Sequence, residues 1–387
     1  MEDDIELPSK GIVFWPVGTG DSTTIFIDDE RILQLDIHHM VQSEDEDEES
    51  HPVIDHLIST LPEVDGVPYL STFALTHPDK DHVKGFAELL KEVTVGELWF
   101  SPRIFKEDDD DLHEDAIAFR EEAERRVQTV IDSNGEVGSG DRVRIIGYDG
   151  ILDVEFFDGF PEQLISYPGE TIVELDGEDV SEQFSAFIHS PFKGTDSEDR
   201  NDTSLGMQVT LVEGNQESKF LLLGDLKYEG IRKIFDITKE NDNEDTLEWN
   251  VLLAPHHCSK SVMYVKNEND NYVLKQDLLN DLEKASLESG YIVASSKSIP
   301  ERNSPGDNPP HAKAKHRYQE IVPIEFMCTH ENPIDNTKPI AFELTIEGLV
   351  LLNADTSIDA GEKSLSTAVS EARGTNKPPK ETAGFGC

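Results

Sequence analysis

The segment Thr76-His77-Pro78-Asp79-Lys80-Asp81-His82 decides the fold of this 387-residue chain. It holds four side chains that can bind a metal ion, namely His77, Asp79, Asp81 and His82. The apolar, β-prone stretch 69–76 precedes it, and an amphipathic helical pattern over 83–91 follows it. A strand that ends where a helix begins holds side chains rigidly at a sheet edge, as a metal site requires. We therefore interpret the segment as a ligand cluster rather than as a polar surface turn.

Two further apolar stretches end in residues that bind metals. Phe220-Leu-Leu-Leu-Gly-Asp225 ends in a carboxylate, and Val251-Leu-Leu-Ala-Pro-His256-His257 ends in two histidines. Gly-Asp after a strand is by itself an ordinary turn, whereas a histidine pair after a buried strand is less ordinary. Three strand ends of this kind in one chain favour a single shared site.

The rest of the chain alternates β-prone and helical patterns, which predicts a mixed sheet arrangement covered by helices in one α/β domain over residues 1–353. The tail 354–387 is poor in large apolar residues and is predicted to be disordered. The expected elements are strands within 11–28, 31–37, 142–146, 154–157, 249–254, 291–295 and 341–352, a hairpin of 204–212 with 219–223, and a helix over 112–131.

The order His-x-Asp-x-Asp-His, Leu-Leu-Gly-Asp, Pro-His-His resembles the metallo-β-lactamase fold superfamily. More closely it resembles the hydrolase domain of the DNA-uptake protein ComEC and its free-standing relatives. Shorter matches follow in the same order over residues 11–352: Pro16–Ser22, Leu35-Asp36, Asn201–Leu205 and Pro309-Pro310-His311. The resemblance implies an αββα sandwich, with Asp36 supporting the ligands from behind and His311 as a late histidine of the site.

The resemblance also implies a site for two divalent metal ions and a metal-bridging hydroxide as nucleophile. It implies that His77 and Asp79 hold one ion, that Asp81, His82 and one histidine of the pair hold the other, and that Asp225 bridges them. We favour His257 as the ligand, which leaves His256 to contact the transition state. Asp81 also has the position to orient the attacking water. A further expected ligand falls on Asn201 or Asp202.

Three features depart from the family pattern. Cys258 stands where the family's His-His-Gly-Ser has glycine. Residues 100–200 form a longer, more acidic insertion than the family leads us to expect, and this insertion is placed to shape the cleft. The membrane helices of ComEC itself are absent from the sequence, so a role as an uptake channel does not carry over.

The expected ligand set favours a hard metal ion. It contains three carboxylates (Asp79, Asp81, Asp225) and three histidines (His77, His82, His257), with Asp202 as a possible addition. Carboxylate oxygens suit Mn²⁺ better than imidazole or thiolate ligands do. We expect Mn²⁺ to support activity at least as well as Zn²⁺.

The charge of the chain limits its partners. It has 33 Lys and Arg against 80 Asp and Glu, a net charge of −47. Phosphate contacts need positive charge, so nucleic acid is excluded as a ligand of the whole surface. Positive charge is nevertheless concentrated at Lys313 and Lys315, just after His311, and at Lys260, just after the histidine pair. A cationic rim would bind a phosphodiester. An ordinary solvated helix is the alternative explanation.

Two functions from different classes of substrate fit these observations. The first is a phosphodiesterase, in particular a nuclease acting on DNA or RNA, as the ComEC resemblance implies. The second is a hydrolase of a small molecule such as an ester, a nucleotide or a lactone, because one fold hosts many reactions. A binding protein with an inert fold is disfavoured by the full ligand set.

The sequence also bears on the compartment. The first ten residues, MEDDIELPSK, lack a basic and an apolar region, and no apolar run approaches the length that spans a bilayer. Only three cysteines occur, which is typical of a reducing compartment. We expect a cytoplasmic protein without a membrane partner.

Overall fold

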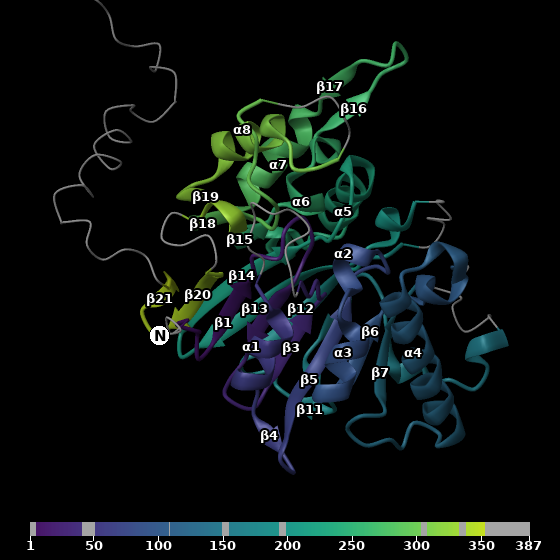
Figure 1. The fold of residues 1–387 in the computed structure, drawn as a ribbon. Coiled ribbons are helices and arrows are strands. Elements are labelled where there is room, and N and C mark those ends of the chain that lie inside the picture. The colour runs from purple at the N-terminus through teal and green to yellow at the C-terminus, as the bar shows by residue number, and fades with distance from the viewer. Residues whose placement is uncertain are drawn as a thin grey trace, which may run out of the picture. The chain divides into compact units, whose positions relative to one another are not determined.

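The computed structural model describes residues 5–40, 51–107, 109–148, 155–192, 199–302, 308–332 and 338–352. Two mixed β-sheets with helices outside them make up this part of the chain (Figure 1). The tail predicted for 354–387 lies outside the described residues. None of the described helices combines the length and the apolar character that a membrane span needs.

The first sheet has the strand order β21-β20-β1-β2-β3-β5-β6-β7-β8, with β4 paired to β5. Pairing is antiparallel from β21 to β3 and parallel from β3 to β8. Its strands are β1 (Gly11–Phe14), β2 (Thr23–Phe26), β3 (Ile32–Leu35), β4 (Glu63–Val64), β5 (Val67–Leu75), β6 (Thr94–Phe100), β7 (Arg142–Ile146), β8 (Ile165–Ser166), β20 (Ile340–Thr345) and β21 (Gly348–Leu351).

The second sheet has the order β19-β18-β15-β14-β13-β12-β9. Pairing is parallel from β19 to β14 and antiparallel from β14 to β9. Its strands are β9 (Thr171–Ile172), β12 (Phe184–Ser190), β13 (Gly206–Glu213), β14 (Gln216–Leu222), β15 (Trp249–Leu253), β18 (Ser286–Ala294) and β19 (Glu325–Cys328). Two separate pairs are β10 (Glu174–Leu175) with β11 (Glu178–Asp179), and β16 (Tyr264–Lys266) with β17 (Tyr272–Leu274).

The helices follow the parallel strands, as crossover connections require. They are α1 (Val53–Thr60), α2 (Lys80–Val83), α3 (Phe86–Glu92), α4 (Glu114–Asp132), α5 (Tyr228–Glu240), α6 (Pro255–Cys258), α7 (Gln276–Ala285) and α8 (Ala312–Ile321), together with short 3-10 helices.

Three separate apolar clusters show how these elements are layered. One lies between the first sheet and α1, α3 and α4, the second between the two sheets, and the third between the second sheet and α5, α7 and α8. Strand alternation explains the division, because Ile12 and Phe14 of β1 join the middle cluster while Val13 joins the first. The order helix, sheet, sheet, helix is the αββα sandwich that the sequence predicts, so this prediction is confirmed.

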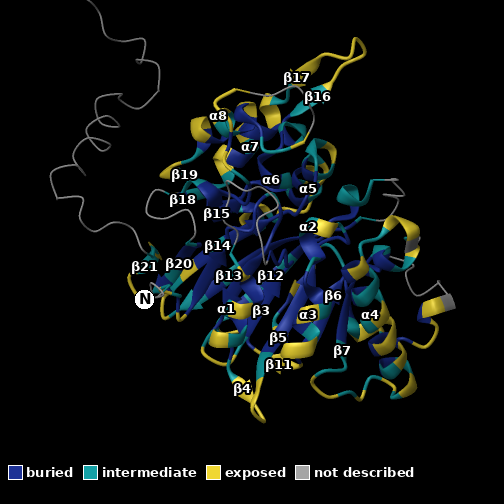
Figure 2. Ribbon diagram, in the orientation of Figure 1, coloured by how far each residue is buried: buried dark blue, intermediate teal, exposed yellow. Residues whose placement is uncertain are grey.

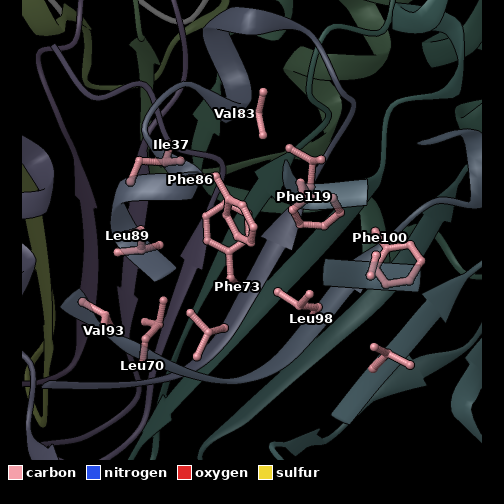
Figure 3. Packing of buried hydrophobic residues seen from close by; sticks show 14 of the residues in the cluster. Ile37, Leu70, Phe73, Val83, Phe86, Leu89, Val93, Leu98, Phe100 and Phe119 are labelled. Carbon is pink, nitrogen blue, oxygen red and sulfur yellow. The ribbon is translucent and has the colours of Figure 1, made fainter. Parts of the chain in front are cut away.

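Aromatic packing fixes the helices that flank the predicted ligand segment. The ring of Phe86 in α3 lies 4.9 Å from that of Phe73 in β5 and 4.8 Å from that of Phe119 in α4 (Figure 3). All three side chains are fully buried, and most residues of β5 and β6 are buried as well (Figure 2). Such ring pairs contribute about 1 kcal/mol each beyond the burial of their area. The segment between β5 and α3 is therefore held at both ends by the core.

The local predictions have two errors. The helix expected over 83–91 is divided into α2 and α3 by Gly85, whose backbone is left-handed with φ +101°. The apolar period continues across the break because both helices face the same core. The strand expected over 154–157 is wrong for its described part, since Glu155–Phe157 form a 3-10 helix. Residues 100–200 supply α4, β7 and β8 to the first layer and β12 to the second sheet.

The parallel parts of the two sheets set the place of the site. Side chains that follow parallel strands gather at the carboxyl ends of those strands. Strands β3 and β5 of the first sheet and β14, β15 and β18 of the second end in the same region. Backbone hydrogen bonds connect these ends: Leu205 N–H donates to the oxygen of Thr76 (3.0 Å), and His256 N–H donates to that of Gly224 (3.0 Å).

Candidate metal centre

Asp225 is the centre of the candidate site. It follows β14 and is buried, and its two carboxylate oxygens face four imidazoles that come from both sheets. The distances from these oxygens to the Nε2 atoms are 3.4 Å for His82, 3.4 Å for His257, 3.7 Å for His256 and 3.9 Å for His77. The three strand ends identified in the sequence thus meet at one carboxylate.

Three of the candidate ligands, which we call the His82 half, are His82, His257 and Asp81. The Nε2 atoms of His82 and His257 lie 3.3 Å apart. The carboxylate of Asp81 lies 3.4 Å from Nε2 of His257. The structure thus brings together three residues that the sequence analysis groups as ligands of one ion, and their role as ligands stays a prediction.

The other three candidate ligands, which we call the His77 half, are His77, Asp79 and His256. Nε2 of His77 lies 3.5 Å from a carboxylate oxygen of Asp79. The second oxygen of Asp79 accepts a hydrogen bond from Nη1 of Arg200 (2.8 Å). The 3.7 Å separation of His256 from Asp225 places His256 at a distance where it too can be a ligand, in addition to the transition-state contact expected for it.

Asp21 is a member of the cluster that sequence reasoning missed as a functional residue. It offers a carboxylate oxygen within 4.8 Å of ligand atoms of His82, Asp225 and His257. Its oxygens lie behind the ligating edges, 3.6 Å from Nδ1 of His257 and 4.0 Å from Nδ1 of His82. Its backbone N–H donates to the oxygen of Asp81 (3.0 Å), which fixes the β1–β2 turn against the ligand segment. The signal was the Gly20-Asp21 turn inside a stretch already matched to the family.

Asp36 supports His82 from behind. Its carboxylate lies 2.7 Å from Nδ1 of His82 and accepts hydrogen bonds from the backbone (2.7 Å) and hydroxyl (2.6 Å) of Thr76. A carboxylate at Nδ1 fixes the tautomer and the ring orientation, so that Nε2 faces Asp225. Asp36 itself has a left-handed backbone (φ +55°).

The histidine pair is held in a strained backbone. His256, His257 and Cys258 have φ values of +51°, +50° and +63°, in the left-handed region that costs a non-glycine residue about 1 kcal/mol or more. Such strain persists only where the surroundings over-determine it, and it is concentrated at functional sites. Cys258 is fully buried in the third apolar cluster, and it has this left-handed conformation at the position where the resemblance leads us to expect glycine.

The charges of the cluster are strongly coupled. Burial disfavours protonated His82 and His257, yet the carboxylate of Asp225, with Asp36 and Asp21, outweighs burial and raises the pKa of both imidazoles well above the usual range. Burial likewise opposes the charge of Asp225, but His257 and His82 hold its pKa well below the usual value. His256 behaves differently, because burial prevails and lowers its pKa.

The donor set fits divalent metal ions. Three buried polar atoms at the site have no hydrogen-bond partner among the described residues: Oδ1 of Asp21, Nε2 of His77 and Oδ1 of Asp225. Leaving such atoms unpaired in the interior costs about 1–3 kcal/mol each. Imidazole nitrogens and carboxylate oxygens that converge in this way are typical of metal sites.

The remaining predicted residues lie around this cluster rather than in it. Among the described residues, Asp202 makes a backbone hydrogen bond to Asp199 (3.3 Å), and no ion pair connects it to the ligands. Lys315 pairs with Glu331 (2.6 Å). Lys260 and Lys313 lie over the rings of Tyr272 (4.8 Å) and Tyr264 (5.6 Å). These four residues stay predictions.

His311 is connected to the histidine pair through the backbone. It is buried, and its backbone N–H donates to the oxygen of Cys258 (3.1 Å). Its Nδ1 accepts a hydrogen bond from the backbone N–H of Lys260 (3.2 Å). This bond places the proton of neutral His311 on Nε2 and makes that atom a donor.

Several solved structures resemble the chain at low sequence identity. The metallo-β-lactamase fold protein YhfI from Bacillus subtilis is 9% identical, with 82% of this chain and 96% of that chain covered and a TM-score of 0.38. The archaeal metallo-β-lactamase superfamily protein ST1585 from Sulfolobus tokodaii is 13% identical, with 81% of this chain and 97% of that chain covered and a TM-score of 0.29. The class B3 di-zinc metallo-β-lactamase LRA-12 from an Alaskan soil metagenome is 12% identical, with 72% of this chain and 90% of that chain covered and a TM-score of 0.32.

These likenesses are too weak to support any statement about substrate, because the identities are below 25% and the TM-scores are below 0.5. No family model and no curated protein matches the chain. The assignment to an α/β fold of the metallo-β-lactamase type therefore follows from the two mixed sheets and their layers. The narrower resemblance to ComEC stays a prediction.

Proposed function

We propose that the chain is a metal-dependent hydrolase of phosphodiesters. The observation that carries this proposal is the position of Asp225 between two sets of ligands, with four imidazoles within 3.9 Å of its oxygens. A carboxylate shared in this way suits a pair of divalent ions, as two-metal hydrolases use. The His82 half and the His77 half would each hold one ion, and Asp225 would belong to both.

Bound divalent ions would supply a Lewis acid and lower the pKa of a water molecule. The protein's own residues add two functions to this chemistry. Asp81 lies 3.4 Å from Nε2 of His257 and is about one third exposed, so its carboxylate can orient an incoming water. His311, whose Nδ1 accepts a hydrogen bond from Lys260, can turn its Nε2–H towards an anionic oxygen of the substrate.

The local charge supports an anionic substrate. Lys260 lies three residues after His257, and α8 begins after His311 and carries Lys313 and Lys315 in its first turns. In a chain of net charge −47, this is an exceptional concentration of cations beside a candidate metal site. A phosphodiester carries a charge that such groups attract, whereas a neutral lactone does not.

Hydrolysis of bis(p-nitrophenyl) phosphate tests this proposal. Purified protein is loaded with Mn²⁺ or Zn²⁺ and compared with the variants Asp81→Asn and Asp29→Asn, the second being an exposed control in the β2–β3 turn. We expect turnover with Mn²⁺ at least equal to that with Zn²⁺. We expect a loss of about 100-fold or more in Asp81→Asn and no loss in the control.

The competing substrate classes are included in the same assay. p-Nitrophenyl phosphate represents monoesters, and a chromogenic lactone represents neutral small molecules. Hydrolysis of the lactone without hydrolysis of the diester would contradict the proposal and favour the small-molecule alternative. Turnover of the diester by Asp81→Asn at the normal rate would place the chemistry elsewhere.

A further inference from the structure

The β16–β17 hairpin extends from the site as a separate surface element. It follows the histidine pair through the 3-10 helix Lys260–Val262, and it stands away from the sheets beside α8 (Figure 1). Figure 2 shows that its tip is exposed. Its registered pairs are Tyr264 with Leu274 and Lys266 with Tyr272. Because side chains alternate along a strand, Tyr264, Lys266 and Tyr272 share one face.

Cations surround the two rings on this face. Nζ of Lys260 and Nζ of Lys266 lie 4.8 and 5.5 Å from the centroid of Tyr272. Nζ of Lys313 lies 5.6 Å from the centroid of Tyr264, whose hydroxyl accepts a hydrogen bond from Nε of Arg317 (3.2 Å). Four basic residues from three elements thus converge on two tyrosines, and Tyr272 is 38% exposed.

The charge of this surface is opposite to that of the chain. Residues 260–275 and 311–317 contain six basic and two acidic residues, in a chain with a net charge of −47. Some of these cations have acidic neighbours, namely Lys266 with Asp270 (3.1 Å), Arg317 with Glu320 (2.7 Å) and Lys315 with Glu331 (2.6 Å). Pairs at the surface contribute little energy, so a polyanion can compete for the same cations.

The hairpin is continuous with the candidate metal centre. The hydroxyl of Ser261 lies 3.4 Å from Nδ1 of His256, and the neighbouring Lys260 donates its backbone N–H to His311. At the other end, Lys275 N–H donates to the oxygen of Met263 (2.8 Å), which fixes the base of the hairpin on the same turn. A chain lying along the hairpin therefore leads towards the ligands.

We propose that this face binds a single-stranded nucleic acid and guides it to the metal centre, an inference that rests on the proposed phosphodiesterase function. Phosphates would contact Lys260, Lys266 and Lys313, and a base would stack on Tyr272. Exposed aromatic rings beside cations are the elements by which proteins hold unpaired strands, because every base has a stacking face. A duplex keeps its bases stacked inside and offers none to Tyr272.

Fluorescence anisotropy of a 5′-fluorescein-labelled thymidine 12-mer tests the proposal. The oligonucleotide carries phosphorothioate linkages that resist cleavage, and the full-length chain is used with its metals. We expect Tyr272→Ala to raise Kd at least about fivefold, since stacking contributes about 1 kcal/mol or more per base. Tyr272→Phe, which keeps the ring, should bind within about twofold of the unaltered protein.

The lysine contribution is measured by salt dependence. Lys266→Gln should reduce the slope of log binding constant against log salt concentration by about 0.7, the value for one phosphate contact on a single strand. Lys91→Gln is the matched control, because Lys91 is an exposed lysine on α3 beside the first sheet. The control should leave both Kd and slope unchanged.

Three results would overturn the inference. One is an unchanged Kd in Tyr272→Ala. The second is an equal loss of binding in Lys91→Gln and Lys266→Gln. The third is equal competition by two compounds of the same charge, inorganic polyphosphate and the unlabelled oligonucleotide. That result would show that charge alone attracts the ligand. The unaltered protein is also assayed with bis(p-nitrophenyl) phosphate, so that failure of the proposed chemistry is distinguished from failure of the docking surface.

Discussion

The two halves of the candidate metal centre share Asp225 but are supported by different chemical groups. In the His82 half, Nδ1 of His82 faces the carboxylate of Asp36 (2.7 Å), and Nδ1 of His257 faces the backbone oxygen of Ser295 (3.1 Å). In the His77 half, hydroxyls take these places: Thr76 at His77 (3.1 Å) and Ser261 at His256 (3.4 Å).

This difference separates a preorganised half from an adaptable one. A carboxylate or carbonyl accepts only, so it holds the imidazole in one tautomer and raises its basicity towards a metal. A hydroxyl can donate or accept, so Ser261 leaves the tautomer of His256 open, whereas the Thr76 hydroxyl donates to Asp36 and can only accept from Nδ1 of His77. We therefore expect the first equivalent of metal to enter the His82 half and the second to bind more weakly in the His77 half.

The largest effect should come from the residue that both halves share. Asp225→Asn removes a buried negative charge next to four imidazoles, so we expect loss of both ions and a fall in kcat/KM of at least about 1,000-fold. Metal content by mass spectrometry after gel filtration, together with diester turnover, measures this. Retention of one full equivalent of metal would show that the halves do not depend on Asp225 equally.

Removing the carboxylate of Asp36, which supports His82, should have a smaller effect, and this effect should be confined to metal binding in the His82 half. Asp36→Asn keeps the size of the side chain but loses the charge that fixes the ring, and such changes typically cost 10–100-fold in metal affinity. We expect this loss for the first equivalent of metal in a competition titration with a chelating dye. Ser261→Ala, which removes the hydroxyl beside Nδ1 of His256, is the counterpart, and it should weaken chiefly the second equivalent.

The pH dependence of metal binding also separates the halves. The adjacent carboxylates raise the pKa values of His82 and His257, so we expect both imidazoles to gain protons more readily than a free imidazole when no metal is bound. Metal must displace these protons, and affinity for the first equivalent should rise with pH by about tenfold per unit for each proton released.

In the His77 half the pKa shift has the opposite direction. Burial lowers the pKa of His256, so its ring is already neutral. The second equivalent should release fewer protons. Calorimetric titration in buffers of different ionisation enthalpy counts the protons released at each step. Equal proton release in the two steps would contradict the assignment of the first ion to the His82 half.

The sequence predicted which candidate ligands come together better than it predicted the residues that support them. The ligands stand at ends of apolar strands, and that position can be read directly from the pattern around His77, Asp225 and His257. Asp21 was missed because a single carboxylate in a turn has no such signal. It reaches the site only through the pairing of β1 with β2 and the backbone bond to Asp81.

The backbone of the site was equally hidden from the sequence. A left-handed conformation is expected at glycine, yet here His256, His257 and Cys258 adopt it. Tertiary packing imposes this conformation, and a local pattern does not contain that information. The same reason explains Gly85, where an unbroken apolar period concealed the division of the helix into α2 and α3.

Arg200 allows a further test of the difference between the two halves, with the smallest expected change in metal affinity. It holds one oxygen of Asp79 (2.8 Å) and contacts Glu107 (3.0 Å), so it orients the only carboxylate that is specific to the His77 half. The positive charge of Arg200 should repel a metal ion, whereas the hydrogen bond from its planar guanidinium should hold Asp79 in the orientation that binds the ion. Both side chains are partly exposed, which screens the repulsion, so orientation should prevail.

Arg200→Gln should therefore weaken the second equivalent of metal by about three- to tenfold and leave the first unchanged. Arg200→Lys keeps the charge but not the planar fork. If orientation is the cause, the lysine variant should resemble the glutamine variant in the chelator titration. Tighter binding of the second equivalent in Arg200→Gln, reversed in Arg200→Lys, would instead show that repulsion governs the His77 half.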